Sequence, residues 1–264
     1  MAESVLLDVA DRVATVTLNR PEAMNALDPE TIAALHEVWV EIRDNPDVWV
    51  AIVTGTGGKA FCAGADLKKT IPNRPGAEGQ ENWRTFQPNA RPGIDSGIEL
   101  WKPLIAAVDG YCLGAGLTLL SACDIRVASQ DATFGLPEVK RGILPTLGAT
   151  QRLIRQLPFA VAMEVLLVGD PLNAEDALKY GLVNKVVAKA DVMSTAREYA
   201  AKFLSGPPLT QRAIKEAAIR SRNMPLDEGM RLEELLSNLV RRTEDFKEGP
   251  KAFAEKRPPV YKGN

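Results

Sequence analysis

The sequence predicts an α/β fold with a helical C-terminal region, and three observations support this prediction. A short apolar run followed by a glycine-rich loop and a helical pattern occurs twice, at 48–69 and 103–122. From about residue 148 onward the apolar residues recur mostly at helical spacing. The 264 residues, 45% of them apolar, suffice for the core of one domain, or of one domain with an appendage. We therefore predict a ββα-type core over residues 1–200 and a helical region over residues 201–264.

The predicted strands are short apolar runs bounded by turn residues. Residues 4–9 and 12–18 indicate two strands joined by a tight turn that contains Asp11. The run 48–55 is mostly apolar, as in a parallel strand that is buried on both faces. Two further buried strands are predicted at 103–110 and 124–129.

The predicted helices follow the 3.6-residue period of an α-helix. In the first, over about 29–44, apolar residues recur at helical spacing, and Asp28 followed by Pro29 favours a helix start. The remaining helices are predicted near 148–156, 158–168, 174–180, 191–204, 208–222, 226–241 and 243–255. The segment 70–97, rich in proline and glycine, is predicted to be irregular.

Composition and charge exclude several classes of protein. The net charge of −2 and the lack of a basic stripe argue against nucleic acid as a partner. No apolar run reaches the ~18 residues that a membrane span needs, and the N-terminus shows no signal peptide. The three cysteines lack CxxC spacing, which disfavours a disulfide framework and a zinc site. We therefore expect a cytoplasmic protein without a metal.

The single histidine limits the chemistry further. His36 lies at the flank of the apolar stripe of the helix predicted over 29–44, where a structural role is expected. A Ser-His-Asp or Cys-His mechanism would need this residue. We therefore expect catalysis by carboxylates and backbone groups.

The segment GTGGKA at 55–60 raises the possibility of a dinucleotide site. It follows a strand and matches the pattern G-x-G-x-x-A. That pattern also requires a helix to begin at the glycines, whereas the next residues here, FCAGA, begin a helix poorly. The sequence therefore disfavours a nicotinamide site.

Two strand exits are rich in small residues. The first reads KAFCAGADLKK at 59–69 and the second DGYCLGAGLTLL at 109–120. Small residues let a ligand approach the main chain, and N–H groups at the start of a following helix can stabilise a developing oxyanion. Tight turns chosen for packing explain the same residues equally well, so the pattern alone leaves both interpretations open.

Eight segments, spread over nearly the whole chain, carry a family resemblance. They are LNRPEAMNAL (18–27), AFCAGADLK (60–68), PLIAAVDGYCLGAG (103–116), ACDIRVAS (122–129), FGLPEVKRGILP (134–145), GATQRL (148–153), A-x-x-Y-G-L-V-N-K-V-V (177–187) and EKRPPVY (255–261). In this order they resemble the enoyl-CoA hydratase/isomerase (crotonase) family. The resemblance implies a crotonase-type (ClpP/crotonase) spiral of ββα units, with a C-terminal helical region that assembles a homotrimer or a dimer of trimers.

The resemblance also implies a site and a substrate class. The backbone N–H groups of Ala65 and Ala115 match the family's two oxyanion donors, and Glu138 matches its catalytic carboxylate. The substrate is then an acyl-CoA thioester, and no separate cofactor is needed. The residues implied to bind the coenzyme A or acyl part are Ala23, Ala63, Ala65, Asp66, Leu67, Lys68, Ala115, Thr118, Phe253 and Lys256. Phe253 and Lys256 would reach coenzyme A across a subunit contact.

Other residues near these motifs have weaker assignments. Asp66 and Asp124 are also expected to cap or pair near the loops. Trp83 and Phe86 are expected to line the acyl pocket. Further candidates for the coenzyme A phosphates, each of which singly fits a solvated surface charge, are Lys59, Lys68, Arg20 and Arg257.

Two departures from the family pattern bear on the reaction. Thr118 stands where family hydratases carry a second catalytic glutamate, and TLGA at 146–149 replaces a glycine-rich GAGG. A single glutamate in an apolar setting has a raised pKa and can shuttle a proton, so Glu138 can serve alone. Hydration of a 2-enoyl-CoA is the leading reaction. The alternatives are double-bond isomerisation, thioester hydrolysis, decarboxylation, lyase cleavage, or acyl-CoA binding without catalysis.

Overall fold

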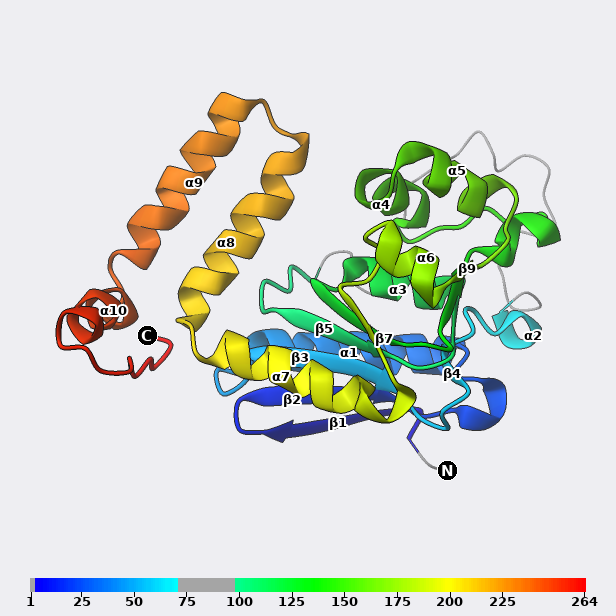
Figure 1. Cartoon of the computed structure of the whole chain (residues 1–264), viewed down its shortest axis with the longest axis horizontal. Coiled ribbons are helices and arrows are strands. Elements are labelled where there is room, and N and C mark those ends of the chain that lie inside the picture. Colours follow the sequence, from blue (N-terminus) through cyan, green and yellow to red (C-terminus); the bar gives the residue numbers. More distant parts are fainter. Residues whose placement is uncertain (1–2, 71–97) are drawn as a thin grey trace.

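The computed structural model describes residues 3–70 and 98–264, and Figure 1 shows their arrangement. The strands are β1 (Val5–Ala10), β2 (Val13–Leu18), β3 (Val50–Gly55), β4 (Ala60–Cys62), β5 (Leu104–Val108), β6 (Tyr111–Leu113), β7 (Ile125–Ser129), β8 (Thr133–Gly135), β9 (Leu172–Asn173) and β10 (Lys185–Val187). The α-helices are α1 (Pro29–Asp44), α2 (Leu67–Thr70), α3 (Ala115–Ala122), α4 (Ala149–Gln156), α5 (Phe159–Leu167), α6 (Ala174–Lys179), α7 (Val192–Leu204), α8 (Pro208–Arg220), α9 (Leu226–Val240) and α10 (Glu244–Ala254). The 3₁₀ helices are η1 (Pro21–Ala23), η3 (Pro137–Arg141), η4 (Lys189–Asp191) and η5 (Ser221–Asn223).

The larger sheet has six strands in the order β1-β2-β3-β5-β7-β10. β1 and β2 form the predicted antiparallel hairpin, and the other neighbours pair in parallel. Its turn places Asp11 and Arg12 at φ values of 49° and 66°. Two positive φ values are typical of the primed turns whose twist matches that of a hairpin.

Helices cover both faces of this sheet, as Figure 1 shows for α1, α3 and α7. In β3, Val50 and Ile52 share a buried cluster with apolar residues of α7. The alternate residues, Ala51 and Val53, belong to the main core with α1 and α3. Because successive side chains of a strand point to opposite faces, this strand needs apolar residues at every position. That requirement explains the uninterrupted apolar run.

A second, smaller sheet has the order β4-β6-β8-β9. It contradicts part of the glycine-rich loop predicted within 48–69, because Ala60–Cys62 of that segment forms β4. It also contradicts the prediction of a loop at the start of GYCLGAG, because Tyr111–Leu113 forms β6. Strands of two or three residues are too short to show a period-2 pattern, so the sequence did not reveal them.

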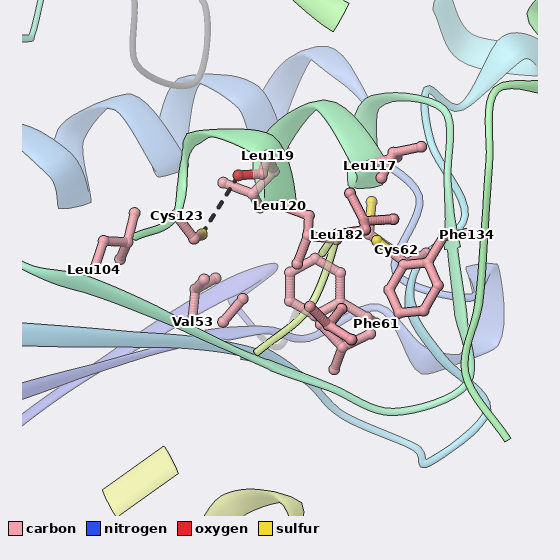
Figure 2. Close-up of a cluster of buried hydrophobic side chains, with 14 of the residues drawn as sticks. Val53, Phe61, Cys62, Leu104, Leu117, Leu119, Leu120, Cys123, Phe134 and Leu182 are labelled. Atoms are coloured by element: carbon pink, nitrogen blue, oxygen red, sulfur yellow. Dashed lines mark hydrogen bonds between the residues drawn. The ribbon is translucent and has the colours of Figure 1, made fainter. Parts of the chain in front are cut away.

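A buried cluster links the two sheets to α3 (Figure 2). Phe61 of β4 and Phe134 of β8 are fully buried and share this core with Val53 of β3. Leu117 and Leu120 of α3 complete it, as do the small side chains of the buried cysteines. Cys62 and Cys112 are fully buried in this core. This packing fixes the start of α3 relative to β4.

Helices α8, α9 and α10 extend away from the two sheets (Figure 1). Lys215 of α8 joins them to the core, since its Nζ lies 2.7 Å from Asp124 Oδ2 and 2.9 Å from the Lys102 carbonyl oxygen. Helix α9 buries none of its residues within the chain, and its Leu226 and Leu239 are 80% and 60% exposed. The predicted helical C-terminal region is thus confirmed, while the division at residue 200 stays a prediction.

Within the two described ranges, no helix is long and apolar enough to cross a membrane. The predicted irregular segment, apart from Thr70 at the end of α2, and its candidate residues Trp83 and Phe86 lie outside those ranges.

Candidate active site

Gly64 and Gly114 allow the loops after β4 and β6 to come into contact. The strands pair in parallel with Cys62 opposite Cys112, so the residues that follow leave the sheet side by side. A Cβ placed on Gly64 would lie 3.0 Å from the Leu113 carbonyl oxygen and 3.4 Å from the Ala115 nitrogen. A larger residue at this position would therefore push the two loops apart.

The first loop is held by residues that follow β2. Asp66 N–H donates to the Leu27 carbonyl at 2.9 Å, and Leu27 N–H donates to the Gly64 carbonyl at 2.8 Å. Ala65 lies between these two bonds, in an isolated parallel bridge with Leu27. Its own N–H donates a hydrogen bond to no residue in the described parts of the chain. That N–H is therefore available to a ligand.

The second loop begins α3 with a similarly unoccupied donor. Gly114 N–H donates to the Gly135 carbonyl at 2.9 Å, and Gly114 precedes the helix without a side-chain cap. Its φ of 57° and ψ of −124° favour glycine. Ala115, the first residue of α3, has an N–H with no acceptor among the described residues. The positive end of the helix dipole adds to the attraction of this N–H for an oxyanion.

Glu138 faces these loops from η3. A Cβ placed on Gly114 would lie 3.0 Å from Glu138 Oε1 and 3.4 Å from the Cα of Gly64. Glu138 Oε2 is buried and accepts no hydrogen bond from the described residues. Burial raises the pKa of this carboxyl above its ordinary value of 4.5, against the opposing effects of its own backbone N–H and of Arg141. The carboxyl therefore exchanges protons more readily near neutral pH than an exposed glutamate does.

Thr118 occupies the first turn of α3 and is buried. Its Oγ1 donates to the Gly114 carbonyl at 3.3 Å, alongside its own N–H at 3.0 Å. The hydroxyl group is thus hydrogen-bonded to the loop that carries Ala115. The position that holds a carboxylate in family hydratases therefore offers no titratable group here.

The other coenzyme A candidates near Ala65 lie within residues 63–68 and at the end of the neighbouring η1. Ala63 follows β4 and donates its N–H to the Met24 carbonyl at 3.0 Å, and Ala23 ends the neighbouring η1. Leu67 and Lys68 begin α2, where Leu67 is half-buried and Lys68 is exposed. The structure thus gathers these candidates around Ala65.

Asp66 has the pairing role that was expected for it. Its Oδ2 lies 3.1 Å from an Arg20 nitrogen, with both side chains largely buried. Arg20 is therefore occupied within the protein. Asp124 likewise pairs with Lys215 and accepts the Leu104 N–H at 2.7 Å.

The C-terminal candidates are not brought to this site within one chain. Phe253 and Lys256 lie in or just after α10, and Figure 1 shows α10 at the opposite end of the molecule from α2. Phe253 is 88% exposed. Arg257 is paired with Glu248 and Glu255, whereas the candidates Lys59 and Lys68 are exposed.

Asn25 is a structural determinant of the site that sequence reasoning missed. It is buried, has a φ of 55°, and donates from Nδ2 to the Thr56 and Ala60 carbonyls at 3.0 and 2.7 Å. Its Oδ1 accepts a hydrogen bond from the Arg20 backbone N–H at 2.9 Å. Asparagine adopts positive φ more readily than most residues, and this property was the available signal in LNRPEAMNAL.

The assembled groups are the Ala65 and Ala115 N–H donors, which have no acceptor among the described residues, and the half-buried Glu138 carboxylate beside Gly114. Such a set suits the stabilisation of an oxyanion and the transfer of a proton beside it. Within residues 3–70 and 98–264, no group of three or more His, Cys, Asp or Glu side chains is placed to hold a metal ion.

Comparisons with known proteins agree on one family. The sequence profile of the enoyl-CoA hydratase/isomerase family matches residues 8–264. An (E)-benzylidenesuccinyl-CoA hydratase of Thauera aromatica is 47% identical over 98% of this chain and 99% of its own length. A carnitinyl-CoA dehydratase of Salmonella paratyphi A is 41% identical over the full length of both chains.

Solved structures show the same likeness in three dimensions. The enoyl-CoA hydratase subunit I of Geobacillus kaustophilus superposes with a TM-score of 0.88 and 35% identity, covering 99% of this chain and 98% of its own. A probable enoyl-CoA hydratase/isomerase of Mycobacterium abscessus reaches a TM-score of 0.87 at 38% identity, with both chains fully covered.

Proposed function

Since the chain belongs to the enoyl-CoA hydratase/isomerase family, we propose that it catalyses proton transfer at the thioester of an acyl-CoA, with hydration of a 2-enoyl-CoA as its reaction. The crotonase-type fold that the sequence implied is the fold of its solved relatives. The observation that carries the proposal is the placement of Glu138 against Gly114, beside two loops whose Ala65 and Ala115 N–H groups have no acceptor among the described residues.

In this mechanism the thioester carbonyl accepts hydrogen bonds from the Ala65 and Ala115 N–H groups. Ionised Glu138 takes a proton from water while the water oxygen bonds to C3 of the enoyl group. The electron pair of the double bond moves onto the thioester as an enolate, which the two donors stabilise. Protonated Glu138 then delivers the proton to C2, which restores the free carboxylate and gives the 3-hydroxyacyl-CoA.

Double-bond isomerisation is the second candidate, and Thr118 is the observation that favours it. Moving a proton from C2 to C4 needs one base that works on both carbons, and Glu138 is the carboxylate available. Hydration remains first because two relatives with 41–47% identity are named as a hydratase and a dehydratase.

A turnover assay tests the proposal. The panel is crotonyl-CoA, (E)-benzylidenesuccinyl-CoA, carnitinyl-CoA for the reverse direction, and a 3-enoyl-CoA for isomerisation. We expect turnover of at least one thioester, lowered about 10²–10⁴-fold in Glu138→Gln. Acyl-CoA binding without any turnover would reject an enzymatic function, and full activity of Glu138→Gln would assign the proton transfer elsewhere.

We also propose that the chain works as a trimer or a dimer of trimers. Helices α8 and α9 enclose a groove of about 730 Å³ with apolar lining residues such as Ile214, Met230, Leu236 and Phe246. Ile214 and Met230 are each 62% exposed in the single chain. Burial of such a surface in a subunit contact would be favourable. It would also let Phe253 and Lys256 serve the site of a neighbouring copy.

The remaining expectations complete the proposal. The reaction uses no cofactor beyond the coenzyme A of the substrate. We place the protein in the cytoplasm, in keeping with three free, buried thiols. Its partners are the acyl-CoA and further copies of itself, and neither nucleic acid nor membrane is among them.

A further inference from the structure

We propose that Arg20 is a positioning residue that holds the Ala65 N–H in place for catalysis. The inference rests on the proposed function, because it concerns one of the two oxyanion donors. Arg20 lies in the segment Arg20–Asp28, which follows β2 and is distant from β4 in sequence.

The Arg20 guanidinium joins three groups of the protein. One terminal nitrogen lies 3.1 Å from Asp66 Oδ2 and 3.2 Å from Asp28 Oδ2. The other terminal nitrogen donates to the Ala26 carbonyl. Only 13% of the Arg20 side chain is exposed, with 15% for Asp66 and 3% for Asp28. Charge pairs sheltered in this way are screened less by solvent than surface pairs are.

These contacts close a ring around Ala65. Backbone hydrogen bonds join Leu27 to Gly64 and to Asp66, the two neighbours of Ala65. Arg20 adds a side-chain link between Asp66 and Asp28, which are the residues immediately after Ala65 and Leu27. The ring therefore fixes the peptide plane of Ala65 from both sides.

Direct binding of a coenzyme A phosphate is the competing role for Arg20. A phosphate at the guanidinium would lie beside the carboxylates of Asp28 and Asp66 and be repelled by both. The guanidinium is also largely enclosed by its protein partners. The geometry thus favours a role through Ala65 over a role in substrate affinity.

The two roles predict different kinetics, and Arg20→Lys separates them. Lysine keeps the charge but lacks the planar fork that spans two carboxylates and a carbonyl. If Arg20 positions the donor, kcat of Arg20→Lys falls about tenfold or more, because small misplacements of reacting groups slow the chemical step. KM then changes by less than about threefold. A raised KM with unchanged kcat would overturn the proposal in favour of phosphate binding.

Two further variants keep the test informative. Asp66→Asn breaks the same link from its other end, so its effect and that of Arg20→Lys should combine less than additively. Arg43→Lys is the matched control, because Arg43 pairs with its exposed neighbour Asp44 on α1, and this variant should retain wild-type kcat. Independent, additive losses in the double variant would count against a shared link.

Hydrogen exchange followed by mass spectrometry gives a readout that does not depend on turnover. We expect Arg20→Lys to speed exchange in the peptide covering residues 60–70 and to leave 111–120 unchanged. If the wild-type protein turns over no thioester, the proposed reaction fails, yet this pattern would still support the positioning role. Unchanged exchange in 60–70 would overturn it.

Discussion

Glu138 is a carboxyl group in a partly buried site that disfavours its ionised form. Its Oε2 is buried without a described partner, and burial raises its pKa above 4.5. A carboxyl group whose pKa is higher in the folded than in the unfolded state stabilises the fold at pH values below the unfolded-state pKa. This stabilisation is lost as the pH rises through the folded-state pKa. The site therefore keeps a proton-transfer group at a cost in stability at neutral pH.

Glu138→Gln should consequently stabilise the protein at pH 7 while it removes activity. The amide keeps the shape of the side chain and carries no charge. We expect the melting temperature to rise at pH 7, because the amide removes the cost of keeping a partly buried charge. The difference should shrink toward zero below pH 4.5, which thermal melts across pH 4–8 would show. A variant that melts lower than wild type at pH 7 would contradict the desolvated carboxylate.

The Thr118 hydroxyl is used in a hydrogen bond within the protein. Because Oγ1 donates to the Gly114 carbonyl, Thr118→Val should lower kcat by less than about threefold, as the backbone bond to that carbonyl remains. Crotonyl-CoA hydration by the wild type should be weak, because loss of one acid/base group costs about 10²-fold. A wild-type rate equal to that of a two-glutamate hydratase, or a large loss in Thr118→Val, would give Thr118 a chemical role instead.

At the scale of elements, the site depends on how closely α3 packs on β4. A Cβ on Gly116 would lie 2.5 Å from the Cys62 carbonyl oxygen and 2.8 Å from Cys62 Cβ. Both atoms belong to a strand that is buried on all sides, so neither can move freely.

Gly116→Ala should therefore destabilise the fold and shift the Ala115 donor. We expect a loss of about 1–3 kcal/mol in the free energy of unfolding, as in other overpacked cores, together with a lower kcat. Gly249→Ala in α10 is the control, because its Cβ would meet only the Tyr261 hydroxyl at 3.3 Å. Denaturant titration and kinetics on both variants measure the effect. Equal stability of Gly116→Ala and wild type would show that α3 can move away from β4.

The long elements were predictable from the sequence, whereas the short ones were not. The helix over 29–44 has a capping Asp28, a proline at its start and a regular apolar stripe, and α1 has the predicted bounds. By contrast, β4, β6 and β8 have three residues each, and β10 lies among helices. Their pairing is set by tertiary contacts rather than by any local pattern.

The site was predictable in part, for a related reason. The small residues of the two loops indicated close backbone approach, and family motifs pointed to Glu138. The network of Arg20, Asp28 and Asp66 joins residues up to 46 positions apart, which no local spacing reveals. Asn25 accepts the Arg20 backbone N–H, and the two carbonyls to which it donates, those of Thr56 and Ala60, were equally hidden because they lie more than 30 residues away.

At the scale of the whole molecule, the single chain leaves an apolar surface exposed on α8 and α9. Met230 lines the groove between these helices and is 62% exposed. The proposed trimer would have three times the 28.6 kDa chain mass, or that mass doubled for a dimer of trimers.

Light scattering tests this assembly. We expect the wild type at micromolar concentration to show trimer or hexamer mass, and Met230→Glu to shift it toward monomer, because a buried unpaired charge is unfavourable. Val9→Glu in β1, at a position 40% exposed and far from the groove in sequence, should leave the mass unchanged. A monomeric wild type, or an intact oligomer in Met230→Glu, would contradict the proposed contact.

In the proposed reaction, one thioester carbonyl accepts hydrogen bonds from the Ala65 and Ala115 N–H groups together. Isotope-edited infrared spectroscopy of acetyl-CoA with a carbon-13 thioester carbonyl tests it directly, since hydrogen bonds to a carbonyl weaken its double bond and lower its stretching frequency. We expect a lower frequency in the bound state than in solution, and the same lowering in Glu138→Gln because both donors remain. A carbonyl frequency unchanged at saturating protein would show that the two N–H groups do not hold the thioester.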